Sequence, residues 1–70
     1  MSIVSSAITK DRDQGFARFV EESHTDSTGK VHVMRRFVPY GYDLTADLAL
    51  HATQIAAQLG DEEAARVLNG

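Results

Sequence analysis

The residues of this chain whose types suit chemistry are its three histidines and the glutamates near them. His24 and His32 stand on either side of Thr25–Gly29, and Glu22 comes two residues before His24. Imidazole and carboxylate groups together can bind zinc. The spacing matches no zinc-ligand motif, however, and His51 lies in a separate segment. We therefore predict no metal site and no cofactor, and we interpret the histidines as exposed residues of strands and a helix.

The run Ser23-His24-Thr25-Asp26 contains the residue types of a nucleophilic triad. Neighbouring residues of a strand point to opposite faces, so Ser23 and His24 cannot assemble one. A chain of 70 residues also has little room for a closed pocket. We predict no catalytic residue and no enzymatic activity.

The chain is short enough for one domain only. A domain of this size buries only about 60% of the surface of its unfolded chain, so its hydrophobic core is small. The sequence has no cysteine, which excludes a disulfide and a thiolate metal site. The remaining way to supplement such a core is contact with a protein partner, and we expect a homo-oligomer or a larger assembly.

The net charge is −3, and Arg35-Arg36 is the only pair of adjacent basic residues. This distribution lacks the basic footprint of a nucleic-acid-binding protein. No apolar run has the length of a membrane span, and the first ten residues lack the pattern of a signal peptide. We predict no direct contact with nucleic acid or membrane. We expect Arg18, Arg35 and Arg36 to pair with Glu21 and Glu22 across strands.

The segment Phe16–Tyr40 predicts one β-hairpin. Its strands are Phe16–His24 and Lys30–Val38, its turn is Thr25–Gly29, and Pro39 ends the pairing. The sequence does not fix the strand register. If His24 lies opposite Lys30, one face carries Ala17, Phe19, Val31, Val33 and Phe37, and the other face carries Phe16, Val20, Met34 and Val38.

Two helices follow the hairpin. Asp43 is a good N-cap for a helix over Leu44–Leu59, and Asp61 for a short helix over Glu62–Leu68, with Gly60 between them. The first helix carries an apolar stripe of Leu44, Leu48, Ala52, Ile55, Ala56 and Leu59, and a polar stripe of Asp47, His51, Gln54 and Gln58. We predict an α+β fold: an antiparallel β-hairpin packed by one amphipathic helix, plus a short C-terminal helix. Residues 16–70 form this single ββαα domain, and residues 1–15 form an arm and connector, with either a helical turn or an extended conformation.

Both hairpin faces are partly apolar, whereas one helix covers only one of them. We therefore expect the other face to bind a protein. We place the Phe16, Val20, Met34 and Val38 face there, and we expect the arm to reach an adjacent chain. Tyr40 and Tyr42 serve equally well as interface anchors or as a lid on the core. The predicted interface residues are Ile3, Val4, Ile8, Phe16, Val20, Met34, Val38, Tyr40 and Tyr42.

The run VEESHTDSTGKVHV, followed by YDLTADLALHATQIAAQL, resembles small structural proteins of tailed bacteriophages. These have a strand, a His-Thr-Asp-x-x-Gly turn, a second strand and an Ala-rich helix; the likeness covers roughly Phe19 to Leu59. It implies a minor non-enzymatic virion component of the tail, neck or capsid, assembled in the host cytoplasm. The alternative is a small acidic inhibitor, such as a phage counter-defence protein, that binds one host protein through Glu62 and Glu63.

Overall fold

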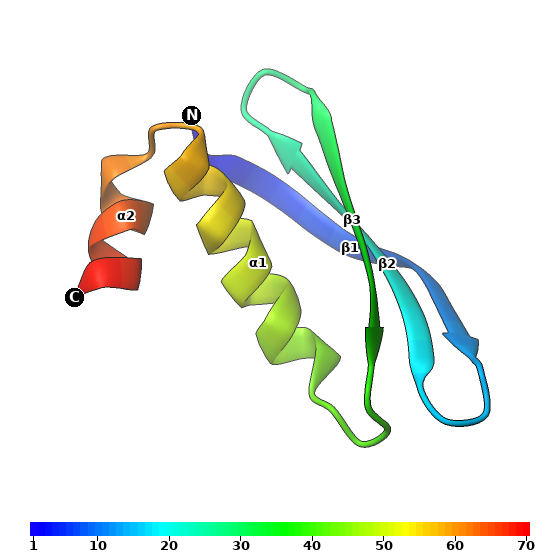
Figure 1. The fold of residues 1–70 in the computed structure, drawn as a ribbon. Helices are drawn as coiled ribbons and strands as arrows, with labels where there is room; N and C mark the ends of the chain where they lie inside the picture. The colour runs from blue at the N-terminus through cyan, green and yellow to red at the C-terminus, as the bar shows by residue number, and fades with distance from the viewer.

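The computed structural model describes residues 1–70 and contains a three-stranded antiparallel sheet followed by two helices (Figure 1). The strands β1 (Ile3–Asp13), β2 (Arg18–Asp26) and β3 (Val31–Val38) lie in the order β1-β2-β3, so β2 is central. The helices are α1 (Leu44–Gln58) and α2 (Glu62–Asn69). The predicted α+β class is confirmed, but the order of elements is βββαα.

The N-terminal segment is not an arm. Residues 3–13 form β1, which pairs with β2 from Ile3 opposite Asp26 to Asp13 opposite Arg18. The register shifts between Ile3 and Ser5 and again between Ile8 and Lys10. Pairing with β2 satisfies backbone groups that would otherwise form an open edge, and this long-range contribution is not visible in the local sequence. The prediction that the domain starts at residue 16 was therefore wrong.

The pairing of β2 with β3 differs from the expected register. His24 lies opposite His32 rather than Lys30, and β2 begins at Arg18 rather than Phe16. A shift of two residues keeps every side chain on its face, because strand side chains alternate with a period of two. The predicted partition of Phe19, Val31, Val33 and Phe37 from Val20, Met34 and Val38 is therefore correct.

Local signals set the starts of both helices as predicted, and each helix ends within one residue of its predicted end. The Asp43 carboxylate accepts hydrogen bonds from the amides of Thr45 (3.0 Å) and Ala46 (3.2 Å). The Asp61 carboxylate accepts one from the amide of Ala64 at 3.1 Å. Between the helices Gly60 has φ +93°, a conformation that glycine adopts without the strain a side chain would add.

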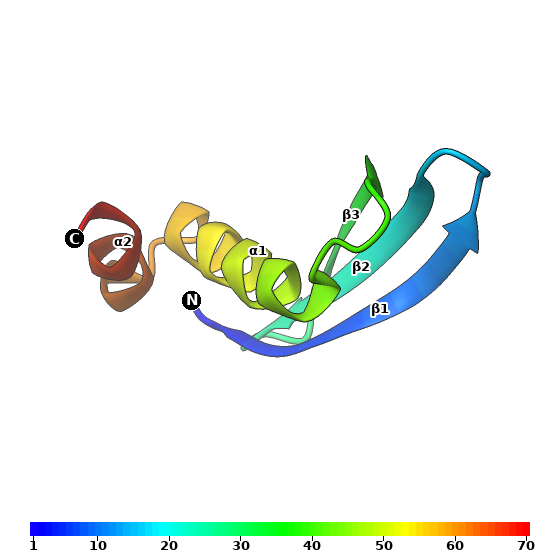
Figure 2. The same cartoon turned by 90° about the horizontal axis from the view of Figure 1, so that it is seen from below.

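The elements form three layers, because α1 lies on one face of the sheet and α2 lies on the far side of α1 (Figure 2). The molecule measures 39 × 28 × 14 Å, and its radius of gyration is 12.9 Å. A compact domain of this length has a radius of about 11 Å. The buried apolar residues are few and mostly small: Ala17, Val20, Val38, Ala56 and Ala64. No helix of the chain is long and apolar enough to cross a membrane.

Candidate functional site

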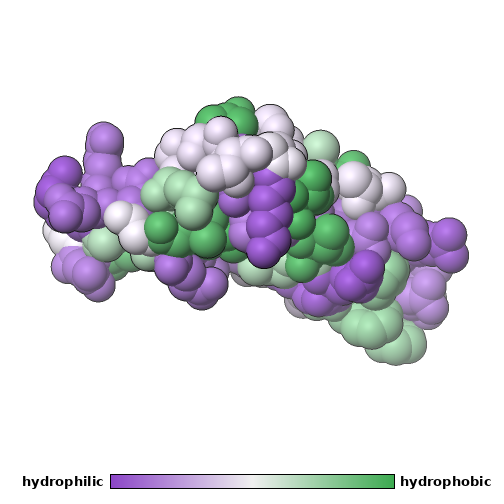
Figure 3. Space-filling view, turned by 90° about the horizontal axis from the view of Figure 1, so that it is seen from above, coloured by the Kyte–Doolittle hydropathy of each residue, from purple (hydrophilic) through white to green (hydrophobic).

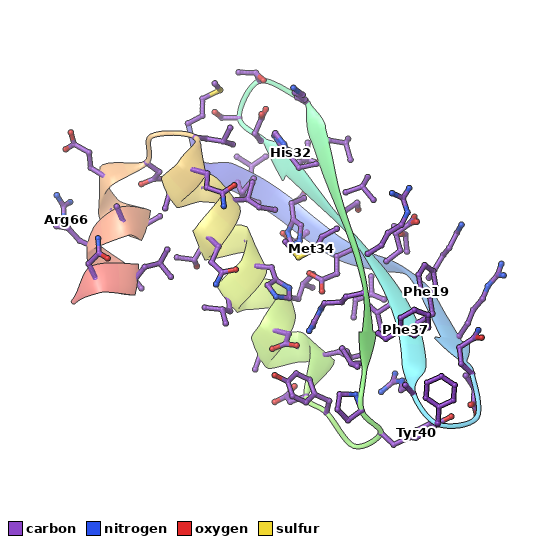
Figure 4. The ribbon with its side chains drawn as sticks, in the orientation of Figure 1. Phe19, His32, Met34, Phe37, Tyr40 and Arg66 are labelled. Carbon is purple, nitrogen blue, oxygen red and sulfur yellow. The ribbon has the colours of Figure 1, made fainter.

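The sheet face opposite α1 is uncovered; we call it the open face. Phe37 is 61% exposed there and Val33 is 48% exposed. Phe19 packs beside Phe37, with ring centroids 5.5 Å apart and ring planes tilted by 60°. Figure 4 shows both rings on the side of the sheet away from α1, and His32 and Met34 on the side that faces it. The chain thus has an aromatic pair on this face, of which Phe37 is exposed and Phe19 is half-buried.

The predicted interface face is therefore the wrong one. Val20 and Val38 are buried on the α1 side of the sheet, and Met34 is half-buried there. Polar contacts explain why α1 covers this face. Asp47 and His51 of α1 point toward the sheet, where Asp47 contacts Arg36 and His51 contacts Glu22. These contacts fix which face α1 covers, and the expectation that Asp47 and His51 face solvent was wrong.

The other predicted interface residues lie at several places. Ile3 is half-buried in β1, whereas Val4 and Ile8 of the same strand are exposed. Phe16 is in the turn between β1 and β2 and is 82% exposed.

The two tyrosines follow β3. The Tyr40 hydroxyl donates a hydrogen bond to the Asp13 carboxylate, which joins this segment to the end of β1. The Tyr42 ring centroid lies 5.9 Å from the Arg36 guanidinium carbon. Both rings remain about half exposed, so the choice between interface anchors and a lid stays open.

The open face carries more positive than negative charge. Register places Lys10 and Arg35 on either side of Glu21, and places Arg12 beside Phe19. The Arg35 Nε donates to Glu21 at 2.7 Å, and the Lys10 Nζ lies 4.0 Å from the same carboxylate. The hydrogen bond from Arg35, aided by the Thr9 hydroxyl, holds the pKa of Glu21 below its ordinary value. Three cations therefore share this face with one carboxylate, and two of them, Lys10 and Arg35, flank it.

The opposite face of β2 carries a buried polar cluster centred on Glu22. The Glu22 carboxylate lies 3.0 Å from Nε2 of His24 and 3.0 Å from Nδ1 of His51. The Arg36 guanidinium lies 3.6 Å from Glu22 and also donates to Asp47. Glu22 and His24 are almost completely buried. Buried polar groups of this kind stay stable only when they are paired, and here most of them are.

The cluster also contains a chain from Ser6 through His24 to Glu22. The Ser6 hydroxyl is 2.7 Å from Nδ1 of His24, and Nε2 of His24 faces Glu22. This connectivity resembles a nucleophilic relay, but neither of the two surface hollows of the molecule is lined by Ser6. Nor do three or more His, Asp or Glu side chains converge in an arrangement that could hold a metal ion. The geometry suits a network that fixes α1 on the sheet.

Asp26 organises the turn between β2 and β3. Its carboxylate accepts hydrogen bonds from the Thr28 hydroxyl (2.5 Å), the Lys30 amide (3.1 Å) and Nε2 of His32 (2.9 Å). The Thr28 hydroxyl first, and then His32, hold the pKa of Asp26 well below its ordinary value. Gly29 completes the turn with φ +90°. The histidines and the glutamate that could have bound a metal thus have structural roles: His32 contacts the turn, and Glu22, His24 and His51 join α1 to the sheet.

The predicted cross-strand ion pairs are confirmed for Arg35 with Glu21 and for Arg36 with Glu22. Arg18 instead pairs with Asp11 of β1, whose position as a strand the sequence did not predict. The hydrogen bond from Arg18 lowers the pKa of Asp11. The sequence did contain a signal for the buried cluster. Glu22, His24 and Asp26 are polar residues at alternate positions, so they lie on one face of β2. Asp47 and His51, four residues apart on one face of α1, are the polar residues that can face them.

A shallow hollow of about 250 Å³ lies between the start of β1 and the two helices. The apolar residues that line it are Ile3, Ala52, Ala56, Ala64 and Val67, and the polar ones are Ser2, Thr53, Asp61 and Glu63. Figure 3 views the molecule from the end that holds the N-terminus, where hydrophobic patches border hydrophilic groups.

Comparisons with protein-family models, with curated proteins and with solved structures found no match to this chain.

Proposed function

We propose that this chain is a small non-enzymatic structural protein that docks on or completes a repeating assembly through the open face of its sheet. The observation that carries the proposal is the exposed Phe37 ring, packed beside the half-buried Phe19, on a face that no element of the chain covers. Exposed aromatic rings bordered by charged groups are typical of protein interfaces. The setting we propose is the virion of a tailed bacteriophage, on the resemblance of the hairpin and helix to such proteins.

The small core supports a role in an assembly. Five apolar residues are buried, and the radius of gyration exceeds that of a compact domain. Contact at the open face would add apolar burial that the isolated chain lacks, at roughly 25 cal/mol per Å² removed from water. The polar groups that suit chemistry are already bonded to one another around Glu22, which favours a structural role for them.

The test uses virus particles grown from a genome that encodes this chain. Mass spectrometry of purified particles should find the chain in a fixed ratio to a major structural subunit. The variant Phe37→Asp should be missing from the particles, while Phe16→Asp, which changes a more exposed phenylalanine outside the strands, should be incorporated. Particles that lack the unmodified chain, or that contain both variants equally, would overturn the proposal.

A further inference from the structure

The open face and the hollow between the helices are complementary surfaces on different sides of the same chain. Phe19 and Phe37 lie at one side of the molecule and α2 lies at the other, beyond α1 (Figure 4). The long dimension is 39 Å. A contact between these two surfaces cannot form within one chain, but it can form between two copies.

The two surfaces match in size and polarity. Phe37 projects from the open face with 61% of its surface exposed. The hollow is shallow, with a volume of about 250 Å³, and the residues that line it include Ile3 and Val67. This volume exceeds the ~150 Å³ of an apolar cavity that holds a benzene molecule, so it is large enough for a phenyl ring. Val67 is itself 69% exposed, so both partners of the contact are apolar groups in water.

The charges match as well. The open face carries three cations, of which Arg35 is next to Phe37 on the same face of β3. Asp61 and Glu63 line the hollow. A cationic surface around an apolar knob thus meets carboxylates around an apolar hollow. In a symmetric face-to-face dimer, each open face would bring three cations and only one carboxylate, Glu21, against the same set of charges, and this excess of positive charge disfavours such a dimer.

We propose that Phe37 of one copy occupies the hollow of a second copy between β1, α1 and α2, with Arg35 facing Asp61 and Glu63. The proposal rests on the docking role of the open face and names its partner. Because the two surfaces differ, the contact is heterologous, and every pair or row of copies still offers one free open face at one end and one free hollow at the other. Copies therefore add head to tail into a row or ring, as a repeating assembly requires.

The test combines two half-blocked variants of the full chain in sedimentation equilibrium. Phe37→Asp removes the knob, and Val67→Lys places a charged side chain in the hollow. Each variant alone should stay monomeric, and an equimolar mixture should form a 1:1 dimer, because each variant keeps the surface that the other has lost. The unmodified chain should grow beyond a dimer as its concentration rises. Loss of the buried phenyl ring should weaken association at least about tenfold.

Phe16→Asp is the matched control and should associate like the unmodified chain. Circular dichroism and thermal melts establish that each variant is folded, and Phe37 and Val67 are exposed enough for the substitutions to be tolerated. A mixture that stays monomeric would overturn the proposal, as would a Val67→Lys chain that still dimerises through its open face. Fluorescence anisotropy with a single-stranded oligothymidine gives a further check, because binding that depends on Phe37 would assign the open face to nucleic acid instead.

The sedimentation experiment and the particle experiment can fail independently of each other. If the chain never self-associates, yet Phe37→Asp alone is lost from particles, the open face docks on a different virion protein. In that case the proposed function stands and the head-to-tail contact is wrong.

Discussion

The carboxylate of Glu22 and the imidazole of His51 join the centre of the sheet to α1. Nδ1 of His51 lies 3.0 Å from Oε1 and 3.1 Å from Oε2 of Glu22, across 29 positions of sequence. Glu22 has 1% of its surface exposed. Nε2 of His24 lies 3.0 Å from the same carboxylate, so both histidines reach Glu22 within hydrogen-bond distance. The position of α1 is therefore set largely by polar contacts.

Replacing Glu22 by glutamine tests this arrangement. The amide NH₂ of glutamine would face N–H donors of the histidines or Arg36, leaving buried donors without acceptors. We expect the free energy of unfolding to fall by about 2–4 kcal/mol, a large part of the roughly 3–10 kcal/mol typical of a chain of this size. Urea denaturation followed by circular dichroism measures it. The exposed Glu63→Gln should change the value by less than about 0.5 kcal/mol, and equal losses in the two variants would contradict the assignment.

Arg36 and Asp47 form a second connection between the sheet and α1, and a double-mutant cycle measures its energy. The Arg36 side chain is 26% exposed and that of Asp47 is 11% exposed. Arg36→Leu leaves Asp47 buried without its cation, and Asp47→Leu removes a partner of Arg36, so each should lower stability. We expect the double variant to lose about 1–3 kcal/mol less than the sum of the two single losses. Additive losses would show that the two side chains do not interact.

The parts of this fold that follow from local chemistry were predictable from sequence. Asp43, Asp61 and Gly60 set the helix ends through contacts within a few residues, and strand alternation assigned Phe37 and Val20 to opposite faces. The face that α1 covers was not predictable in this way. Its choice depends on a polar stripe of β2 meeting a polar stripe of α1, and each stripe taken alone is typical of a solvent-exposed surface.

The sequence pattern did not predict β1 for a related reason. Residues 10–13 are all charged, and Ser5-Ser6 interrupts the apolar residues before them. In the structure several polar side chains of β1 have partners on β2: Ser6 with His24, Thr9 with Glu21, and Asp11 with Arg18. A strand whose side chains are satisfied by a neighbouring strand needs no apolar alternation of its own, so its periodicity was uninformative.

Asp26 should make the protein sensitive to acid. Its pKa is lowered in the folded state, chiefly by the Thr28 hydroxyl and then by His32, whereas an unfolded aspartate titrates near pH ~3.9. The stabilisation is therefore fully present above about pH 4 and is lost as the pH falls below this toward the folded-state pKa. Thermal melts from pH 6 to pH 2 should show a steeper loss for the unmodified chain than for Thr28→Val. Ser27→Ala leaves the Asp26 hydrogen bonds in place and should keep the full acid dependence; an unchanged slope in Thr28→Val would contradict this assignment.

Val20 and Val33 provide a matched pair for the two faces of the sheet. Val20 on β2 is 0% exposed beneath α1, whereas Val33 on β3 is 48% exposed on the open face. Val20→Ala removes two buried methyl groups and leaves a cavity, so it should lower the free energy of unfolding by about 2 kcal/mol. Val33→Ala should cost the dilute monomer less than about 1 kcal/mol, the size of a difference in strand propensity. Denaturation of both variants at low concentration compares them.

At concentrations where copies associate, Val33→Ala should instead show the larger change in sedimentation, because the open face then becomes buried. Equal losses for the two variants in the dilute monomer would mean that α1 does not cover the face we assign to it.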